Sequence, residues 1–208
     1  MTPVKENNLT ERTWNEDELK AALSGSTKTD LEVAKKLSSL KESYNLLVQR
    51  KPGRVAEIRL AILRELARQK AQKGVFVTSS ISPSRVTEQL EESGLKPENV
   101  TIIDASGAAE HEDKNVVVIE DQSDLTDMFS QIEKALEKNR GQKAFLVFDS
   151  VSTLLVYNDE KSVEKFFNQL VQKISSYKVK ALFFATKSKE TESTIQTISN
   201  FCDDVVEF

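Results

Sequence analysis

The sequence feature that most constrains the fold is an alternation, beginning at Tyr44, of short apolar runs with longer amphipathic stretches. The short runs are apolar throughout instead of at every second position, which is typical of strands buried on both faces of a sheet. Strands and helices that alternate along a chain indicate an α/β fold. We therefore predict a doubly wound, mainly parallel sheet with helices on both faces.

The expected elements follow from the lengths of these runs and stretches. Strands are predicted at 44–48, 74–78, 100–104, 116–120, 143–148, 180–186 and 205–208, and helices at 55–71, 83–93, 125–139, 162–177 and 192–201. The helix at 55–71 has Val55, Ile58, Ile62 and Leu66 on one side, with Arg64 and Arg68 opposite. This apolar side should pack on the sheet.

Residues 1–42 are polar and contain two candidate helices, at 17–23 and 30–40. The second begins at Asp30, a residue type that favours the N-cap position, and repeats apolar residues every three positions. We expect it to dock on the following domain. The predicted organisation is an N-terminal helical extension at 1–42 and an α/β domain at 43–208.

Length and composition exclude several classes of protein. A chain of 208 residues suits one domain with a short extension. Cys202 is the only cysteine and His111 the only histidine, so an internal disulfide and the usual zinc ligand sets are excluded. The N-terminus has no apolar signal core, and no apolar run approaches the ~20 residues of a membrane helix. We expect a cytoplasmic protein without membrane contacts.

The predicted strand at 143–148 leads directly into Asp149 and Ser150. Nucleotide hydrolases use an acid at the end of an apolar strand to hold Mg²⁺ or its water ligand. An alternative is that Asp149 caps a turn or accepts hydrogen bonds from loop amides. The motif alone leaves both interpretations open.

Three segments carry a resemblance to a known family. Residues 146–157 resemble the Walker B strand and following segment of RecA-superfamily proteins, especially archaeal-type KaiC-like ATPases. Residues 74–78 resemble the second strand of these proteins, and 201–208 the strand that closes their core sheet. The resemblance spans 44–208 and implies a RecA-like P-loop NTPase fold. It also implies that subunits associate side by side with nucleotide between neighbours.

The chain departs from this family at the phosphate loop. Such a loop has a Gly, four residues, and then Gly-Lys-Ser/Thr, because it needs exposed amides, a lysine for the phosphates and a hydroxyl for Mg²⁺. Residues 49–54 read Gln-Arg-Lys-Pro-Gly-Arg and lack that ending. Pro52 also removes one amide donor. The resemblance therefore implies a degenerate Walker A motif without its lysine.

A second departure follows Thr78, where active KaiC-like proteins carry a glutamate that activates water. This chain has Ser79 and Ser80 instead. A serine hydroxyl without a partner is a poor general base near neutral pH. With both elements missing, we expect a pseudoenzyme with no assigned catalytic residue, since phosphoryl transfer depends on them.

Some residues could still bind an anion. Arg50, Lys51, Gly53 and Arg54 lie at the start of the helix predicted at 55–71, where amides and the helix dipole favour phosphate. With Asp149 and Ser150 they form a candidate site for ATP or ADP, in which Asp149 would hold Mg²⁺. The alternative for 50–54 is a solvated basic turn.

Lys187 and Lys189 follow the strand predicted at 180–186. They resemble paired basic residues that some KaiC-like subunits extend toward a neighbour's nucleotide. This implies an inter-subunit role like that of an arginine finger. The alternative is a solvated charged loop.

Three functional hypotheses result. The first is a non-catalytic RecA/KaiC-like domain, acting as a regulatory or scaffolding subunit, whose partner is itself, a related subunit or another signalling or regulatory protein. It requires no cofactor. The second is an unconventional nucleotide-binding protein or slow ATPase that uses ATP or ADP with Mg²⁺. The third is a nucleic-acid-binding accessory protein that uses the basic residues within 50–73, against which the net charge of −4 counts.

Overall fold

The computed structural model describes residues 26–38, 40, 42–71, 73–107, 113–186 and 188–208. Its strands form a parallel seven-stranded sheet in the order β4-β3-β2-β5-β6-β1-β7. The strands are β1 Tyr44–Arg50, β2 Lys73–Thr78, β3 Val100–Asp104, β4 Val116–Val118, β5 Ala144–Asp149, β6 Lys180–Thr186 and β7 Asp204–Glu207. The predicted fold class is confirmed.

Helices connect these strands and cover both faces of the sheet. They are α2 Lys28–Leu37, α3 Val55–Arg68, α4 Pro83–Ser93, α5 Leu125–Lys138, α6 Val151–Tyr157, α7 Glu160–Ser175 and α8 Glu192–Ser199, with a short 3₁₀ helix at Pro97–Asn99. None of the described helices is long and apolar enough to cross a membrane.

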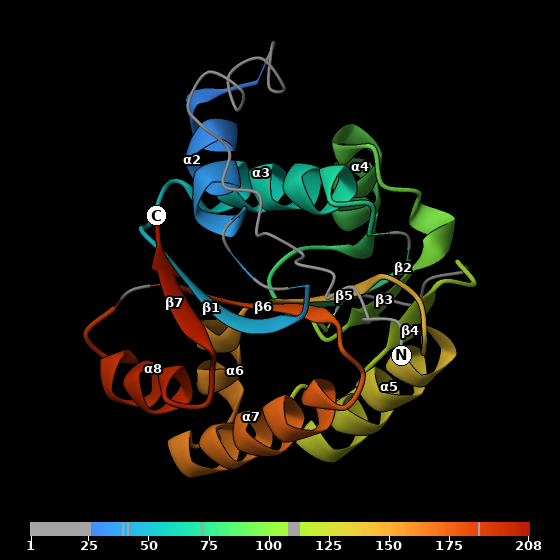
Figure 1. Cartoon of the computed structure of the whole chain (residues 1–208). Coiled ribbons are helices and arrows are strands. Elements are labelled where there is room, and N and C mark those ends of the chain that lie inside the picture. The colour runs from blue at the N-terminus through green and yellow to red at the C-terminus, as the bar shows by residue number, and fades with distance from the viewer. Residues whose placement is uncertain (1–25, 39, 41, 72, 108–112, 187) are drawn as a thin grey trace, which may run out of the picture.

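The two faces carry different helices. In Figure 1, α3 and α4 lie above the sheet with α2 beside them, and α5, α6, α7 and α8 lie below it. The chain moves outward from β1 through β2 and β3 to β4, and then returns through β5 and β6 to β7. Because crossovers between parallel strands are right-handed, this reversal moves the connecting helices to the opposite face.

Each face has its own hydrophobic core, because the strand side chains alternate between the faces. On the α3 side, Phe76, Phe145 and Phe184 pack with Ile58 and Ile62. The other side is dominated by aromatic contacts: the Phe167 ring lies 5.2 Å from Phe148 and 5.4 Å from Phe183 between centroids, edge to face. Burial on both faces explains why the inner strands β2, β5 and β6 are almost continuously apolar, whereas the edge strands β4 and β7 are only partly buried.

Helix α2 docks on α3, as the sequence predicts. Val33 and Leu37 are fully buried in the same core as the α3 residues. The expected cap is wrong by three positions: Thr27 is the N-cap, and its hydroxyl accepts a hydrogen bond from the amide of Asp30 while the Asp30 carboxylate accepts one from the amide of Thr27. This is a capping box, which the Thr27–Asp30 spacing also fits. The helix expected at 17–23 lies outside the described residues.

Helix α6, like the 3₁₀ helix at Pro97–Asn99, was not predicted from the sequence. Its N-cap is Ser150, whose hydroxyl accepts a hydrogen bond from the Thr153 amide, and Val151 and Leu154 are buried. This helix begins directly after β5. Its N-cap residue Ser150 therefore directly follows Asp149, the last residue of the strand.

The reversal of the chain creates two positions where neighbouring strands send their loops to opposite faces. At one, β2 leads to α4 and β5 leads to α6; at the other, β1 leads to α3 and β6 leads to α8. In open α/β sheets, ligand sites lie at the carboxyl ends of strands at such positions. The ends of β1, β2, β5 and β6 therefore define the candidate site.

Candidate functional site

Asp149 is the centre of a buried ionic cluster at the carboxyl end of β5. Its partner Arg50 ends β1, and β6 lies between these two strands, with Thr186 beside Arg50 and Phe184 beside Asp149. The Arg50 side chain therefore crosses β6 to reach Asp149. Its guanidinium lies 4.4 Å from the centroid of the Phe184 ring on the way.

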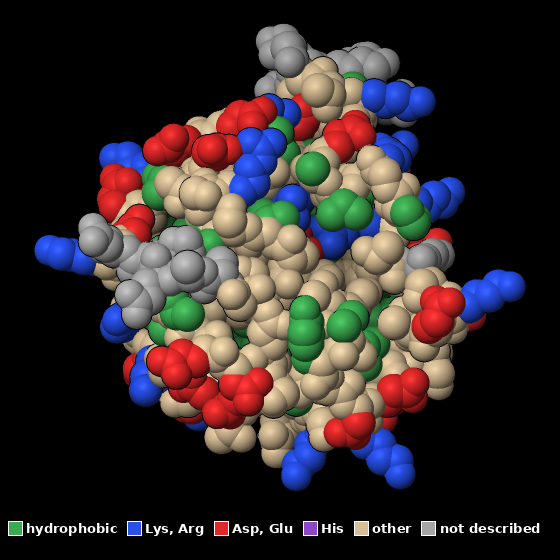
Figure 2. Space-filling model, turned by 180° about the vertical axis from the view of Figure 1, so that it is seen from behind, with side chains coloured by type: hydrophobic (Ala, Val, Ile, Leu, Met, Phe, Trp, Pro, Cys, Tyr) green, Lys and Arg blue, Asp and Glu red, His purple; other side chains and the backbone are tan. Residues whose placement is uncertain are grey.

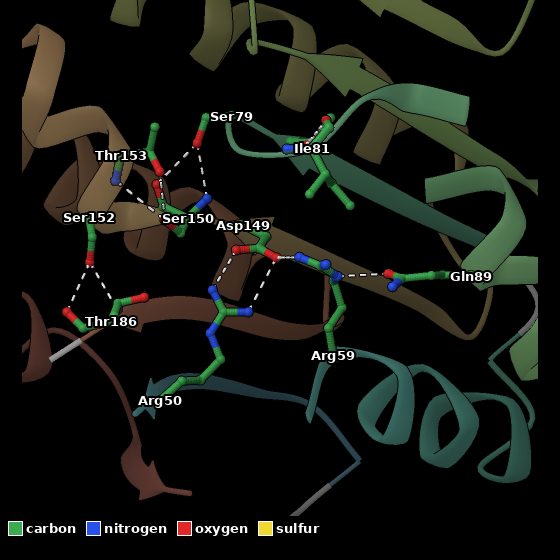
Figure 3. A network of polar contacts seen from close by, with 11 residues as sticks. Arg50, Arg59, Ser79, Ile81, Gln89, Asp149, Ser150, Ser152, Thr153 and Thr186 are labelled. Carbon is green, nitrogen blue, oxygen red and sulfur yellow. Dashed lines mark hydrogen bonds and ion pairs between the residues drawn. The ribbon is translucent and has the colours of Figure 1, made fainter. Parts of the chain in front are cut away.

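Two arginines bind the two carboxylate oxygens of Asp149 (Figure 3). Arg50 Nη2 lies 2.6 Å from Oδ1 and Nη1 lies 3.3 Å from Oδ2. Arg59, from the second turn of α3, donates to Oδ2 through its own Nη1. All three side chains are almost fully buried, with exposed fractions of 0% for Asp149, 1% for Arg50 and 3% for Arg59.

The cluster, which we call the Arg-Asp-Arg cluster, carries two positive charges and one negative charge. Arg59 Nε donates to Oε1 of Gln89 in α4 at 2.7 Å, so a neutral acceptor disperses part of its charge. Arg50 Nε has no hydrogen-bond partner among the described residues, and the ring of Phe184 faces the guanidinium instead. Such a cation–π contact stabilises a desolvated cation.

Serine hydroxyls join the ends of neighbouring strands. Ser79 Oγ accepts a hydrogen bond from the Ser150 amide at 3.0 Å and donates to the Ser150 carbonyl at 3.2 Å. Ser152 Oγ joins β6 in the same way, because it accepts from the Thr186 amide at 2.9 Å and donates to the Thr186 carbonyl at 3.3 Å. Ser79, which directly follows β2, therefore connects this strand to the start of α6.

The connection between β1 and α3 is a tight turn of four residues, 51–54. The amide of Arg54 donates to the Lys51 carbonyl at 3.4 Å, and that of Ile58 donates to the Arg54 carbonyl at 3.0 Å, so the helix begins at once. Gly53 has φ +92°, the left-handed region that favours glycine. Gly53 is the only glycine in this turn.

The structure separates the predicted site residues. Arg50, Asp149 and Ser150 lie together and are buried. Lys51 and Gly53 are exposed in the turn. Arg54 turns toward α2, where its Nη2 donates to Thr29 Oγ1 at 2.9 Å and to Glu32 Oε2 at 3.3 Å.

The candidate inter-subunit residues lie elsewhere. Lys189 is exposed and lines a cavity of about 540 Å³ between α8 and the ends of β6, β1 and β7. Lys187 lies outside the described residues.

Chemically, the Arg-Asp-Arg cluster resembles a structural ion cluster more than a reaction centre. The charge of Asp149 is offset by two guanidinium groups, which oppose the approach of a cation. Ser150 caps α6, and no general base lies among its hydrogen-bond partners. Within the described ranges, no group of three or more His, Cys, Asp or Glu residues could hold a metal ion.

Arg59 and Gln89 are the site residues that sequence reasoning missed. Arg59 lies on the buried side of α3, three residues before Ile62 and seven before Leu66. A charged residue that continues an apolar helical stripe indicates a buried partner, because an unpaired cation is rarely buried. That signal was available in the sequence, but it does not identify Asp149 as the partner.

Solved structures with the same fold come from the archaeon Pyrococcus horikoshii. The uncharacterized protein PH0321, crystallised in complex with an unknown peptide, has a TM-score of 0.63 at 10% sequence identity, with 85% of this chain and 81% of that chain covered. The KaiC-like protein PH0186 has a TM-score of 0.58 at 13% identity, with 80% and 71% covered. This likeness shows a RecA-type fold of the KaiC-like kind.

Comparison with curated protein sequences finds no match. A family model does match, over residues 44–208, which span β1 to the residue after β7. The matched region holds the whole sheet and the Arg-Asp-Arg cluster, and it covers most of the chain. The chain therefore belongs to the family of unknown function DUF7504.

Proposed function

We propose that this chain is a non-catalytic RecA/KaiC-like domain that acts as a regulatory or scaffolding subunit through protein–protein contacts. The observation that carries the proposal is the pairing of both Asp149 oxygens with Arg50 and Arg59 inside the protein. The fold provides the sheet and its switch points, and the cluster includes Asp149, the residue that the resemblance implies as a Mg²⁺ ligand.

The physical argument is one of competition for a carboxylate. A Mg²⁺ ion takes carboxylate oxygens at about 2.0–2.1 Å in octahedral geometry and keeps several waters. To reach Asp149 it would have to displace two guanidinium groups, which would then be buried without a counter-ion. Leaving a buried charge unpaired costs about 3–5 kcal/mol. The cluster therefore opposes metal-dependent nucleotide binding.

The turn at 51–54 supports the same conclusion. Phosphate loops bind nucleotide through a series of backbone amides and a lysine that reaches the phosphates. Here the Lys51 amide donates to the Phe208 carbonyl at 3.3 Å and the Arg54 amide donates to the Lys51 carbonyl. Pro52 has no amide hydrogen. Few donors of this turn are left for a phosphate.

A surface for protein contacts is provided by α6. Val156 and Tyr157 are the large hydrophobic side chains most exposed among the described residues, at 73% and 51%. Figure 2 shows hydrophobic side chains grouped near the centre of the face seen from behind, where α6 lies. Exposed apolar groups with a polar surround are typical of interaction sites. The partner is a second copy of this chain or a related RecA/KaiC-like subunit.

The peptide in the PH0321 crystal structure supports protein recognition by this fold. By analogy alone, a segment of a partner protein would be bound by the present chain. The analogy is between folds, and it assigns no binding site on this chain.

Titration calorimetry with ATP and ADP, with and without Mg²⁺, tests the first half of the proposal. We expect no Mg²⁺-dependent binding to the full chain. Micromolar binding that requires Mg²⁺ would contradict the proposal and support an unconventional nucleotide-binding protein. Lys51→Gln is the informative variant in that case, because Lys51 is exposed and its loss leaves the Arg-Asp-Arg cluster intact.

Sedimentation across a range of protein concentrations tests the second half. We expect self-association that is weakened in a Val156→Ser/Tyr157→Ser variant. Val117→Ser serves as a control, because Val117 is a partly buried hydrophobic residue on β4 rather than α6. A strict monomer under all nucleotide conditions would rule out self-association and leave only a different partner subunit.

A further inference from the structure

The amino end of the sheet, opposite the Arg-Asp-Arg cluster, has a second charged site. A cavity of about 490 Å³ lies there, between the starts of β5 and β6 and the ends of α3, α5 and α7. Four cationic side chains line it, from Arg140, Lys143, Lys178 and Lys180, with one carboxylate, from Glu42. Its volume is within the range of about 300–1,000 Å³ that small-molecule sites occupy.

The Arg140 side chain is held in place by its neighbours. Its Nε and Nη2 donate to the two carboxylate oxygens of Glu137 at 2.8 and 2.7 Å. Its guanidinium also lies 4.8 Å from the centroid of the Tyr177 ring. The charge of Arg140 is therefore already balanced, and the net charge of the cavity depends on the three lysines and on Glu42.

The three lysines differ from Arg140 because no described acidic side chain lies within ion-pair distance of them. Lys180 Nζ donates to the neutral Oε1 of Gln69. Burial lowers the pKa of the Lys180 ammonium, and the charge of Lys143 lowers it further; the carboxylates of Glu65 and Glu42 act in the opposite direction without outweighing these effects. Two lysine charges thus repel each other across a partly desolvated space, and a bound anion would relieve that repulsion.

The dipoles of the neighbouring helices do not neutralise all of the positive charge of the lysines. The ends of α3, α5 and α7 each contribute about half a negative charge at most, screened by solvent. Together with the carboxylate of Glu42, they offset part of the charge of the three lysines and leave the cavity positive. Hydroxyl and amide groups of Ser43 and Gln142 also line it and can donate hydrogen bonds.

We propose that this cavity binds a small polyanion of the phosphorylated-metabolite class, with Lys143, Lys178 and Lys180 as the cations that hold it. The size of the cavity fits a metabolite, and three cations with no carboxylate at ion-pair distance match a ligand with two or three negative charges. The site is separate from the Arg-Asp-Arg cluster, because it lies at the opposite end of the parallel strands.

The experiment uses inorganic pyrophosphate as the probe, with the full-length chain at low salt in a titration calorimeter. We expect one site, and a loss of affinity of at least fivefold in Lys143→Gln and in Lys178→Asn. Asparagine is chosen at position 178 because Lys178 has φ +54°, a conformation that asparagine tolerates. Both lysines are exposed, so neither change threatens folding.

Two charge-matched controls distinguish this site from other basic surfaces. Lys165→Gln removes an exposed lysine on α7, and Lys51→Gln removes one in the turn after β1, at the opposite end of the sheet. Both should leave pyrophosphate affinity unchanged. Equal weakening by Lys165→Gln would show a general charge effect, and weakening by Lys51→Gln alone would place the anion at the turn. Either result, or the absence of pyrophosphate binding, would overturn the proposal.

Nucleic acid is the competing source of phosphate. A single-stranded oligonucleotide should be tested in the same way. If it binds more tightly than pyrophosphate, and its affinity falls steeply with salt as expected for contacts to several phosphates, the lysines belong to a nucleic-acid surface. That result would overturn the metabolite proposal. The nucleotide titration described above reports on Mg²⁺ dependence, so the two proposals can fail independently.

Discussion

Arg50 Nη2 lies 2.6 Å from Oδ1 of Asp149, although 99 positions separate the two residues in the sequence. The contact crosses β6 and joins two strands that do not pair directly. Replacing Asp149 with alanine would leave Arg50 and Arg59 buried without their counter-ion. We expect this variant to lose about 3–5 kcal/mol of unfolding free energy, measured by urea denaturation.

The matched control removes all three charges together. In Arg50→Met/Arg59→Met/Asp149→Leu, no buried charge remains unpaired, and similar replacements of buried ion clusters are often neutral or stabilising. We expect the triple variant to be at least about 2 kcal/mol more stable than Asp149→Ala. A triple variant as unstable as Asp149→Ala would show that the residues stabilise the fold through packing instead of charge.

The sheet was predictable because its signal is local. The inner strands β1, β2, β3, β5 and β6 are largely buried and are therefore mostly apolar runs, and the longer helices have a 3.6-residue stripe, so the order of these elements follows from the sequence. Helix α6 was not predictable in this way. Its seven residues provide only two buried side chains, Val151 and Leu154, which is too short a pattern to distinguish a helix from a loop.

The candidate site was only partly predictable, because its contacts are not local. Arg50 and Asp149 were both identified as site residues, but as an anion ligand and a metal ligand. Their pairing depends on the strand order, which places β1 and β5 on either side of β6. Periodicity along one element contains no information about that neighbour relationship.

The capping box of α2 provides a prediction that depends on pH. Burial opposes ionisation of Asp30, but hydrogen bonds from Thr27 and the charge of Arg64 outweigh it, and the pKa of Asp30 falls below its ordinary value. A carboxyl group whose pKa is lowered by folding stabilises the folded protein at pH values above its unfolded pKa of about 3.9. This stabilisation is lost as the pH falls through the pKa of the folded state. Wild type should therefore be more stable than Asp30→Asn at pH 7, and the difference should shrink at lower pH.

Urea titrations of wild type and Asp30→Asn at pH 7 and at acidic pH measure this difference. Thr27→Ala is the companion variant, because it removes the hydroxyl cap and should cost about 1 kcal/mol. A stability difference for Asp30→Asn that is the same at both pH values would contradict the assigned role of the carboxylate.

The thiol of Cys202 should be unreactive. Burial, with a smaller contribution from Asp203, raises its pKa to about 12. Because the thiolate is the nucleophile, modification by a thiol reagent near pH 8 should be slower than for free cysteine, on the order of a thousandfold. The rate should approach that of free cysteine when urea unfolds the protein. Fast modification of the native chain would show that Cys202 is accessible and ionisable.

Gly74 provides the sharpest test of packing in the sheet, because it pairs with Phe145 across β2 and β5. A Cβ atom at position 74 would overlap the Phe145 ring, which is rigid and fully buried. Gly74→Ala should therefore cost about 1–3 kcal/mol, since overpacking forces side chains and backbone apart.

Phe145→Leu supplies the control, because the smaller side chain gives the new methyl group room. The double variant Gly74→Ala/Phe145→Leu should lose less unfolding free energy than the two single variants together. We expect a favourable coupling of at least about 1 kcal/mol. Urea denaturation of the four proteins measures that coupling. Simple additivity would mean that the destabilisation arises from the strand backbone, because in that case the size of the ring opposite Gly74 would make no difference.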